Sequence, residues 1–274
     1  MSRVTAAFDE LRKKREKGLV VYLTAGDPDL AHSLAYLEAA ADGGADLLEV
    51  GVPFSDPTAD GPTIQAAAAR ALGGGTTVTA VLDLVARFRA RRETPVVLFG
   101  YYNPFLRYGT DRLCRDAAAA GADAFLVVDL PCEESGEMAP AARREGLDWI
   151  PLATPTTGAD RLAALSKGGS GFLYLVSVTG ITGARTDLPP GLSGWVRKVK
   201  GAVTLPVAVG FGISTPEQAR SAGQNADAVV VGSAIVSRIE RLGASPRLVP
   251  EVSAFAASLA DAVKGGGVTA GGVD

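Results

Sequence analysis

Residues 47–65 read LLEVGVPFSDPTADGPTIQ and join a short buried strand to a loop that carries acids. The strand is apolar except for Glu49, and the Pro- and Gly-rich loop after it contains a second carboxylate, Asp60. A carboxylate at the end of a buried strand is unfavourable unless it serves a function, because its charge loses hydration there. Two carboxylates this close together indicate acid/base chemistry.

Eight apolar segments recur along the chain with helical segments between them, at an average spacing of about 30 residues, the length of one βα unit. Each segment is continuous rather than alternating, as expected of parallel strands buried on both faces. We therefore predict a (β/α)8 TIM barrel formed by a single domain over residues 1–264, followed by a disordered tail at 265–274. The predicted strands are 19–24, 46–50, 95–100, 124–128, 148–152, 171–176, 205–209 and 228–231.

Helices are predicted between the strands, for example over residues 30–41 and 78–91, which are rich in Ala and Leu. An extra N-terminal helix is predicted, whose apolar face is formed by Val4, Phe8 and Leu11. Its basic segment, residues 12–17, then faces the solvent. Gly-Ala-Asp precedes two strands, which fits a helix that ends in Gly and turns into a strand.

Composition excludes several classes of protein. With 27 basic and 30 acidic residues the net charge is −3, so no nucleic-acid footprint is expected. Cys114 and Cys132 are too few for a disulfide scaffold and fit a reducing compartment. No segment approaches the ~20 apolar residues that span a bilayer, and residues 1–18 do not read as a signal peptide. We expect a cytoplasmic protein that binds neither nucleic acid nor membrane.

The barrel prediction restricts the candidate active-site residues to those that follow a strand. The only histidine, His32, lies on a predicted helix, and no lysine follows a strand. Neither a His-based metal site nor a Schiff base is therefore expected, which leaves proton transfer by carboxylates without metal or cofactor. Structural roles as buried, turn or bracing acids remain the alternative for each carboxylate, and the phenols are better suited to pocket walls than to acids. The candidates are Glu49, Asp60, Asp129, Tyr22, Tyr101, Tyr102 and Tyr174.

A phosphate site is predicted at the ends of strands seven and eight, where glycines let backbone N–H groups approach an anion. Residues 210–214 read GFGIS, and residues 232–234 read GSA. Gly180 and Gly183, after strand six, would add a third wall. Ser214 and Glu217 have the spacing of a capping box for the next helix.

These segments together resemble the α subunit of tryptophan synthase, over about residues 8–236. The string PFSDPTADGPTIQ is the most specific part of the resemblance, whereas the glycine-rich segments occur in other phosphate-binding barrels. Tyr22 is a departure, because phenylalanine is familiar at that position. The matching segments are TAGDP (24–28), Glu49 with GVPFSDP (51–57), ADGPTIQ (59–65), DLP (129–131), VTGITG (178–183), GFGIS (210–214) and GSAIV (232–236).

The resemblance implies retro-aldol cleavage of indole-3-glycerol phosphate to indole and D-glyceraldehyde 3-phosphate, a carbon–carbon lyase reaction of tryptophan biosynthesis. Glu49 would be the general acid/base, and Asp60 would accept the indole N–H and stabilise charge on the ring nitrogen. Because the surroundings of Glu49 are apolar, we expect it to titrate above its ordinary pKa. The indole pocket would include Tyr22, Phe99 and Tyr101. Phosphate would bind at Gly183, Gly212, Gly232 and Ser233, and Tyr174, Asp129 and Thr182 would be auxiliary.

The resemblance also implies a β subunit that carries pyridoxal phosphate, in an α2β2 heterotetramer, with no cofactor in this chain. The loop at 53–60 would face that partner, and the loop at 182–190 would close over the substrate. Two alternatives remain open: another phosphate-binding barrel, such as an isomerase or an indole-glycerol phosphate synthase, and a barrel kept mainly to activate a partner. The synthase is disfavoured because it should have strand-end lysines.

Overall fold

The computed structural model describes residues 2–176, 191–210, 212–243 and 245–265. Within these residues nine strands form one sheet in the order β5-β4-β3-β2-β1-β9-β8-β7-β6, and every pair is parallel. The strands are β1 (Gly18–Thr24), β2 (Leu47–Gly51), β3 (Val96–Gly100), β4 (Ala124–Val127), β5 (Asp148–Trp149), β6 (Leu152–Ala153), β7 (Leu173–Val176), β8 (Val207–Gly210) and β9 (Ala228–Val231).

The two edge strands, β5 and β6, are consecutive halves of one predicted strand, 148–152, and this connection closes the barrel. Ile150 donates its N–H to Phe125 on the β4 side at 2.9 Å, whereas the Pro151 carbonyl accepts the Tyr174 N–H on the β7 side at 2.9 Å. Proline has no N–H to continue a ladder. The predicted fifth strand is therefore present but interrupted at Pro151, and the (β/α)8 prediction is confirmed.

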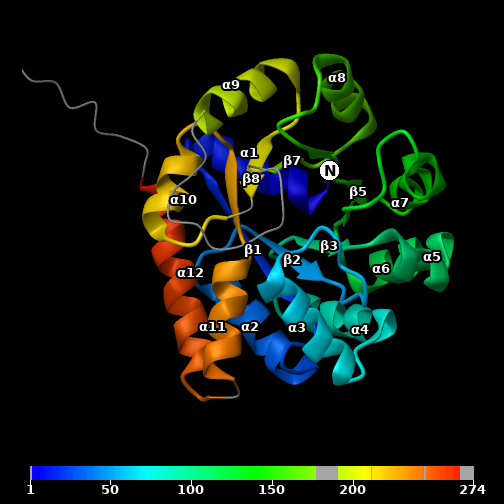
Figure 1. The fold of residues 1–274 in the computed structure, drawn as a ribbon, viewed down its shortest axis with the longest axis vertical. Coiled ribbons are helices and arrows are strands. Elements are labelled where there is room, and N and C mark those ends of the chain that lie inside the picture. The colour runs from blue at the N-terminus through cyan, green and yellow to red at the C-terminus, as the bar shows by residue number, and fades with distance from the viewer. Residues whose placement is uncertain (1, 177–190, 211, 244, 266–274) are drawn as a thin grey trace, which may run out of the picture.

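Helices surround the strands (Figure 1). The predicted helices 30–41 and 78–91 correspond to α2 and α4, and α3 is a further helix between β2 and β3 that was not predicted. The helices are α1 (Arg3–Lys14), α2 (Leu30–Asp42), α3 (Pro62–Gly73), α4 (Val78–Arg89), α5 (Tyr102–Tyr108), α6 (Thr110–Ala120), α7 (Ala139–Arg144), α8 (Ala159–Gly168), α9 (Leu192–Ala202), α10 (Pro216–Gly223), α11 (Ser233–Leu242) and α12 (Leu248–Lys264).

Side chains along each strand point alternately into the barrel and out toward the helices, which divides the core into two layers. On β2, Leu48 and Val50 point outward and pack against the surrounding helices, whereas Leu47 points into the barrel interior. Glu49 has the same parity as Leu47 and therefore also points inward. The barrel interior is a packed apolar core, and a carboxylate stands at its C-terminal end.

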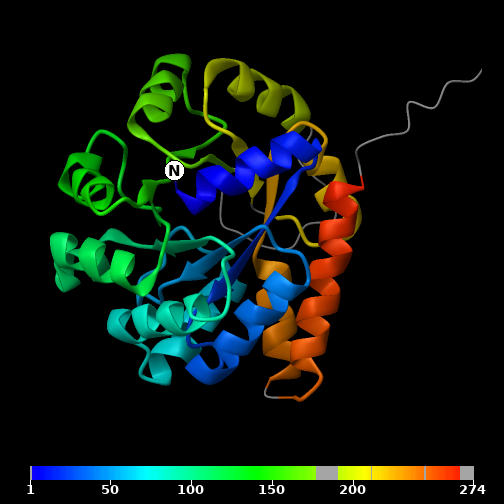
Figure 2. The same cartoon turned by 180° about the vertical axis from the view of Figure 1, so that it is seen from behind.

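Helix α1 covers the opposite, N-terminal end of the barrel (Figure 2). Val4, Phe8 and Leu11 are buried in the same cluster as the interior strand residues, and the Phe8 ring lies 5.5 Å from the Phe172 ring. The predicted apolar face of this helix is thus confirmed. Apolar side chains of α1 therefore close the N-terminal end of the barrel interior.

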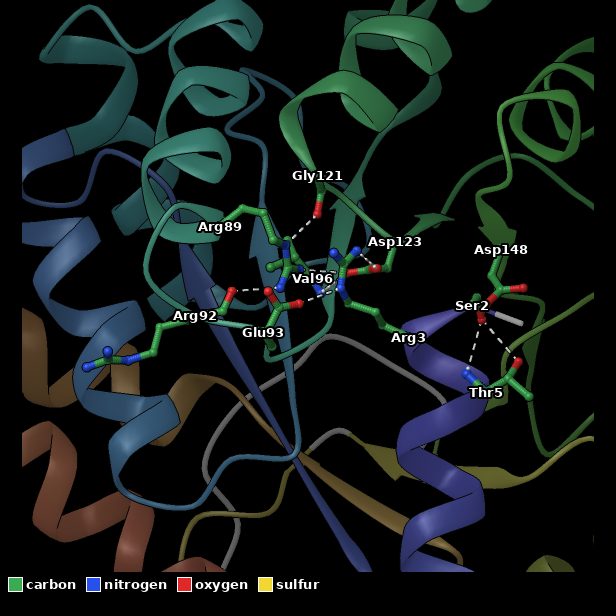
Figure 3. Close-up of polar contacts among 10 residues, drawn as sticks. All are labelled: Ser2, Arg3, Thr5, Arg89, Arg92, Glu93, Val96, Gly121, Asp123 and Asp148. Carbon is green, nitrogen blue, oxygen red and sulfur yellow. Dashed lines mark hydrogen bonds and ion pairs between the residues drawn. The ribbon is translucent and has the colours of Figure 1, made fainter.

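Aspartates at the N-terminal ends of strands have a structural role that the sequence did not reveal. Asp123 accepts the backbone N–H of Val96 at 2.8 Å and an ion pair from Arg89 at 2.8 Å (Figure 3). Asp46 and Asp227 likewise accept a backbone N–H from a neighbouring strand's first residues. Each of these acids therefore supplies an acceptor for a backbone N–H at the start of a neighbouring strand.

The described helices and strands extend from Arg3 to Lys264. Of the predicted tail, residues 266–274 lie outside the described residues. Among the helices that the structure describes, none has the length and apolarity required to cross a bilayer.

Candidate active site

Glu49 is buried inside the barrel as the central residue of β2, beside Tyr22 in the parallel register with β1. The residue is 1% exposed, and its Oε1 atom has no hydrogen-bond partner among the described residues. Burial raises the pKa of Glu49 to about 8, so the carboxyl is mostly protonated at neutral pH. The expectation that Glu49 titrates above its ordinary pKa is confirmed.

Asp60 ends the loop that follows β2 and is 7% exposed. The Tyr101 hydroxyl donates to Asp60 Oδ2 at 3.0 Å, while the same hydroxyl oxygen accepts the Ala59 N–H at 3.0 Å. The Gln65 side chain donates to the Asp60 carbonyl at 2.8 Å. Burial raises the pKa of Asp60 to about 6, although the hydrogen bond from Tyr101 opposes that rise. Asp60 is therefore mostly ionised at neutral pH.

The two carboxyls line one cavity at the C-terminal end of the barrel. Most of the residues that the sequence assigned to the site therefore line this cavity. Ile64 and Val230 also line it, although the sequence analysis did not predict them. Ile64 lies in the PTIQ segment and Val230 at an inward position of β9. The motif could therefore have identified Ile64, and the alternation of side chains along the strand could have identified Val230. The cavity is lined by Tyr22, Glu49, Asp60, Ile64, Phe99, Tyr174, Val230, Gly232 and Ser233.

Aromatic rings form the apolar wall of this cavity. Tyr22 and Phe99 meet edge to face with ring centroids 5.1 Å apart, and the Tyr22 hydroxyl lies 3.3 Å from Thr24 Oγ1. Burial, followed by the nearby Asp60 charge, raises the pKa of Tyr22 well above its ordinary value. Burial and then Glu49 do the same for the pKa of Tyr174. Both phenols therefore stay neutral and do not compete with the carboxyls for protons.

The N-terminus of α11 also lines the cavity. Gly232 occupies the N-cap position and Ser233 begins the helix, and no side chain caps this turn within the described residues. Uncapped N–H groups and the helix dipole make such a terminus suited to an anion. Gly212, with φ of +83°, precedes α10 but is not among the residues lining the cavity.

The predicted capping box at Ser214 and Glu217 is wrong by one residue. Thr215 is the N-cap of α10 and accepts the Gln218 N–H at 3.2 Å, while the Gln218 side chain accepts the Ser214 N–H at 2.8 Å. The helix begins later because Pro216 occupies its first position.

Four other predicted site residues lie apart from the cavity or outside the described residues. Asp129 is exposed, accepts the Tyr102 N–H at 2.7 Å and lines a separate cavity next to β4. Tyr101 contacts Asp60 rather than lining the cavity, and its ring packs 5.3 Å from Phe54. Thr182 and Gly183 lie outside the described residues.

The donor set of the cavity suits acid/base chemistry. In the described part of the chain, no group of three or more His, Cys, Asp or Glu side chains is arranged to hold a metal ion. No lysine is among the described residues that line the cavity. Among the described residues that line the cavity, Glu49 and Asp60 are the carboxyls, one mostly neutral and one mostly anionic at neutral pH.

Gly51 is required by the position of Tyr22. A Cβ atom at Gly51 would lie 2.2 Å from the Tyr22 hydroxyl oxygen. We expect Gly51→Ala to destabilise the fold by roughly 1–3 kcal/mol and to push the Tyr22 ring into the cavity. Urea unfolding of Gly51→Ala, Tyr22→Leu and the double variant checks this, with recovery of stability in the double variant as the expected result. Gly194→Ala, where the added methyl meets nothing within 4 Å, is the matched control; equal losses at both glycines would contradict the steric explanation.

Comparison with known proteins agrees with this geometry. The family model described as tryptophan synthase alpha chain matches residues 8–264. The tryptophan synthase alpha chain of Geobacter sulfurreducens is 50% identical over 263 residues, covering 96% of this chain and 99% of that one. The crystal structure of tryptophan synthase subunit alpha from Legionella pneumophila superposes with a TM-score of 0.90 at 38% identity, covering 96% and 98% of the two chains. A Mycobacterium tuberculosis tryptophan synthase structure gives a TM-score of 0.87 at 38% identity, covering 96% of this chain and 98% of that one. This chain therefore belongs to the tryptophan synthase alpha chain family.

Proposed function

We propose that this chain is a carbon–carbon lyase that cleaves indole-3-glycerol phosphate to indole and D-glyceraldehyde 3-phosphate in tryptophan biosynthesis, with Glu49 and Asp60 as its catalytic residues. The observation that carries the proposal is the split between two carboxyls of one cavity: the pKa of Glu49 is raised to about 8 by burial, and that of Asp60 to about 6. Such a split separates an acid from an anion at neutral pH.

Glu49 acts first as an acid and then as a base. Its carboxyl proton is transferred to C3 of the indole ring, which places positive charge on the ring nitrogen. The resulting Glu49 carboxylate then removes the proton from the substrate hydroxyl nearest the ring. The bond between C3 and the side chain breaks, its electron pair returns to the ring, and an aldehyde forms. Glu49 ends protonated, so no external proton is consumed.

Asp60 supplies the fixed negative charge. In our proposal its carboxylate accepts the indole N–H and stabilises the cation that forms when C3 is protonated. The hydrogen bonds from Tyr101 and Gln65 support this role, because they hold both the side chain and the backbone of Asp60. Tyr22 and Phe99 provide flat apolar walls for the ring, and Tyr101 is assigned to positioning Asp60.

The substrate phosphate is assigned to the N-terminus of α11, at Gly232 and Ser233. The uncapped first turn of this helix at the edge of the cavity supports that assignment. Gly212, whose positive φ opens the backbone before α10, and Gly183 are proposed as further parts of the phosphate site. Tyr174 is proposed to contact the glycerol portion. Asp129 and Thr182 stay auxiliary candidates.

The proposed partner is a tryptophan synthase β subunit in an α2β2 heterotetramer in the cytoplasm. That subunit would carry pyridoxal phosphate, and this chain needs no cofactor for the cleavage. The loop between β2 and α3 supports a partner-controlled site, because Ser55, Asp56, Thr58 and Ala59 are exposed at its tip while Asp60 at its end is buried. A partner that contacts the exposed tip would therefore act on the same loop that carries Asp60.

Indole release tests the proposed function directly. The purified chain is expected to form indole from indole-3-glycerol phosphate, and addition of a pyridoxal-phosphate-containing β subunit should raise the rate at least about tenfold by increasing the population of the ordered loop. Tryptophan should form from serine only when both subunits are present. Failure to form indole under either condition would refute the lyase assignment, and formation of indole-3-glycerol phosphate from its ring-open precursor would favour the synthase alternative.

A further inference from the structure

Three charged side chains connect separate elements beside the active-site cavity; we refer to Asp27, Arg70 and Glu240 as the Arg70 clamp. Arg70 donates through Nε and Nη2 to the two carboxylate oxygens of Asp27, at 2.7 and 2.9 Å. Its Nη1 donates to Glu240 at 2.9 Å. The Asp27 side chain is 2% exposed and that of Glu240 is 49% exposed. The buried Arg70–Asp27 ion pair, which we call the inner arm of the clamp, is therefore stronger than the exposed Arg70–Glu240 pair.

The clamp connects two helices that each begin at or beside a residue lining the proposed site. Arg70 lies on α3, which begins two residues after Asp60, and Glu240 lies on α11, which begins at Ser233. The two helices also contact each other, and Ile64 from α3 and Val236 from α11 belong to one apolar cluster. A shift of α3 relative to α11 therefore changes the separation between Asp60 and Ser233.

The inner arm fixes α3 to a rigid part of the barrel. Asp27 lies in the loop after β1, the strand between β2 and β9. That loop packs tightly against the segment after α3, since a Cβ atom at Gly26 would lie 2.0 Å from Thr76 Oγ1. The Gly26 N–H also donates to Ser33 Oγ at 2.9 Å. The loop is thus held independently of Arg70 and can serve as an anchor for α3.

We propose that Arg70 is a positioning residue that sets the distance between the Asp60 end and the α11 end of the cavity. A planar guanidinium that bonds two carboxylates at once fixes both distance and orientation, which a single charge does not. A ligand that spans both ends requires that separation, whereas a fragment that contacts only one end does not. Misplacement on the scale of an ångström is enough to lower turnover strongly.

This inference rests on the proposed function, and its experiment compares the whole substrate with its two halves. For Arg70→Lys and Arg70→Met, kcat/KM for indole-3-glycerol phosphate is expected to fall about ten- to a hundredfold. The dissociation constants of indole and of glycerol 3-phosphate, measured separately by calorimetry, are expected to stay within about twofold of the wild-type values. Weakened binding of both fragments by the same factor as the substrate would overturn the inference.

Matched variants separate positioning from stability. Arg89→Lys alters a comparable ion pair, with the 4% exposed Asp123 side chain, at the opposite end of the barrel and should leave kcat/KM per folded molecule unchanged. Arg70→Met leaves Asp27 buried without its cation and will lower stability, so Glu240→Gln, which exposes no buried charge, provides a folded test with an expected loss of about two- to fivefold. Unchanged kcat/KM in both Arg70→Lys and Glu240→Gln would refute the clamp. Wild-type turnover is measured first, so failure of the lyase assignment is recognised separately.

Discussion

Glu49→Gln is expected to lower indole formation by at least about a thousandfold while the barrel stays folded. Glutamine has nearly the same shape as glutamic acid, and the surroundings of Glu49 impose no charge partner, because burial is the cause of its raised pKa. The amide can neither give a proton to C3 nor take one from the hydroxyl. Indole release at pH 7, with circular dichroism as the folding check, measures the effect.

The same substitution has a pH-dependent effect on stability. Because the pKa of Glu49 rises from 4.5 in the unfolded chain to about 8 in the folded one, its protonated form favours folding. That contribution is complete below about pH 4.5 and is lost as the pH rises to about 8. Glu49→Gln should therefore gain stability relative to wild type across this window, by up to about 1.4 kcal/mol per pH unit, and the difference should level off above it.

Urea unfolding at pH 5, 7 and 9 measures that difference. Glu38→Gln serves as the control, because Glu38 lies on α2 outside the cavity and pairs with Arg91 at 3.1 Å. A constant stability difference between Glu49→Gln and wild type at all three pH values would contradict the buried, protonated state of Glu49. Near-normal indole release by Glu49→Gln would contradict its catalytic role.

The strands were predictable because they are buried on both faces. The continuous apolar segments at 19–24 and 228–231 coincide with β1 and β9 to within one residue. The interruption at Pro151 was visible in the sequence, but which neighbour each half pairs with depends on the closure of the whole barrel. The aspartates that precede strands were interpreted as part of the turn between a helix and the next strand. In the structure, Asp123 instead accepts the N–H of Val96, 27 residues earlier. Such a pairing becomes apparent only when adjacent strands are placed side by side.

The candidate site was predictable to the extent that strand position determines it. Glu49 follows from inward parity at a strand end, and Gly232 with Ser233 follows from the loop after the last strand. The burial of Asp60 did not follow, because it depends on Tyr101, 41 residues later, and on the unpredicted helix α3. Arg70 gave no signal, since a lone arginine on a helix is ordinarily exposed. Tertiary contacts between distant segments account for what the sequence left open.

Asp60→Asn is expected to lower kcat/KM by about a hundred- to a thousandfold, the usual loss when one preorganised electrostatic group is removed from a transition state. Asparagine keeps the size of the side chain and accepts the Tyr101 hydrogen bond, but it carries no charge to offset the cation on the ring nitrogen. Asp56→Asn, on the exposed tip of the same loop, is the control for the isolated chain. Equal turnover in Asp60→Asn and Asp56→Asn would contradict the electrostatic role.

The pH profile separates the charge of Asp60 from its geometry. With the pKa of Asp60 raised by burial to about 6, and that of Glu49 to about 8, activity that needs anionic Asp60 and protonated Glu49 falls below the first value and above the second. Asp60→Asn should lose the acid limb and keep the alkaline one. Tyr101→Phe removes a hydrogen bond that lowers the pKa of Asp60, so the acid limb should move to higher pH. An acid limb that persists in Asp60→Asn would assign that ionisation to another group and leave Asp60 with a role in geometry alone.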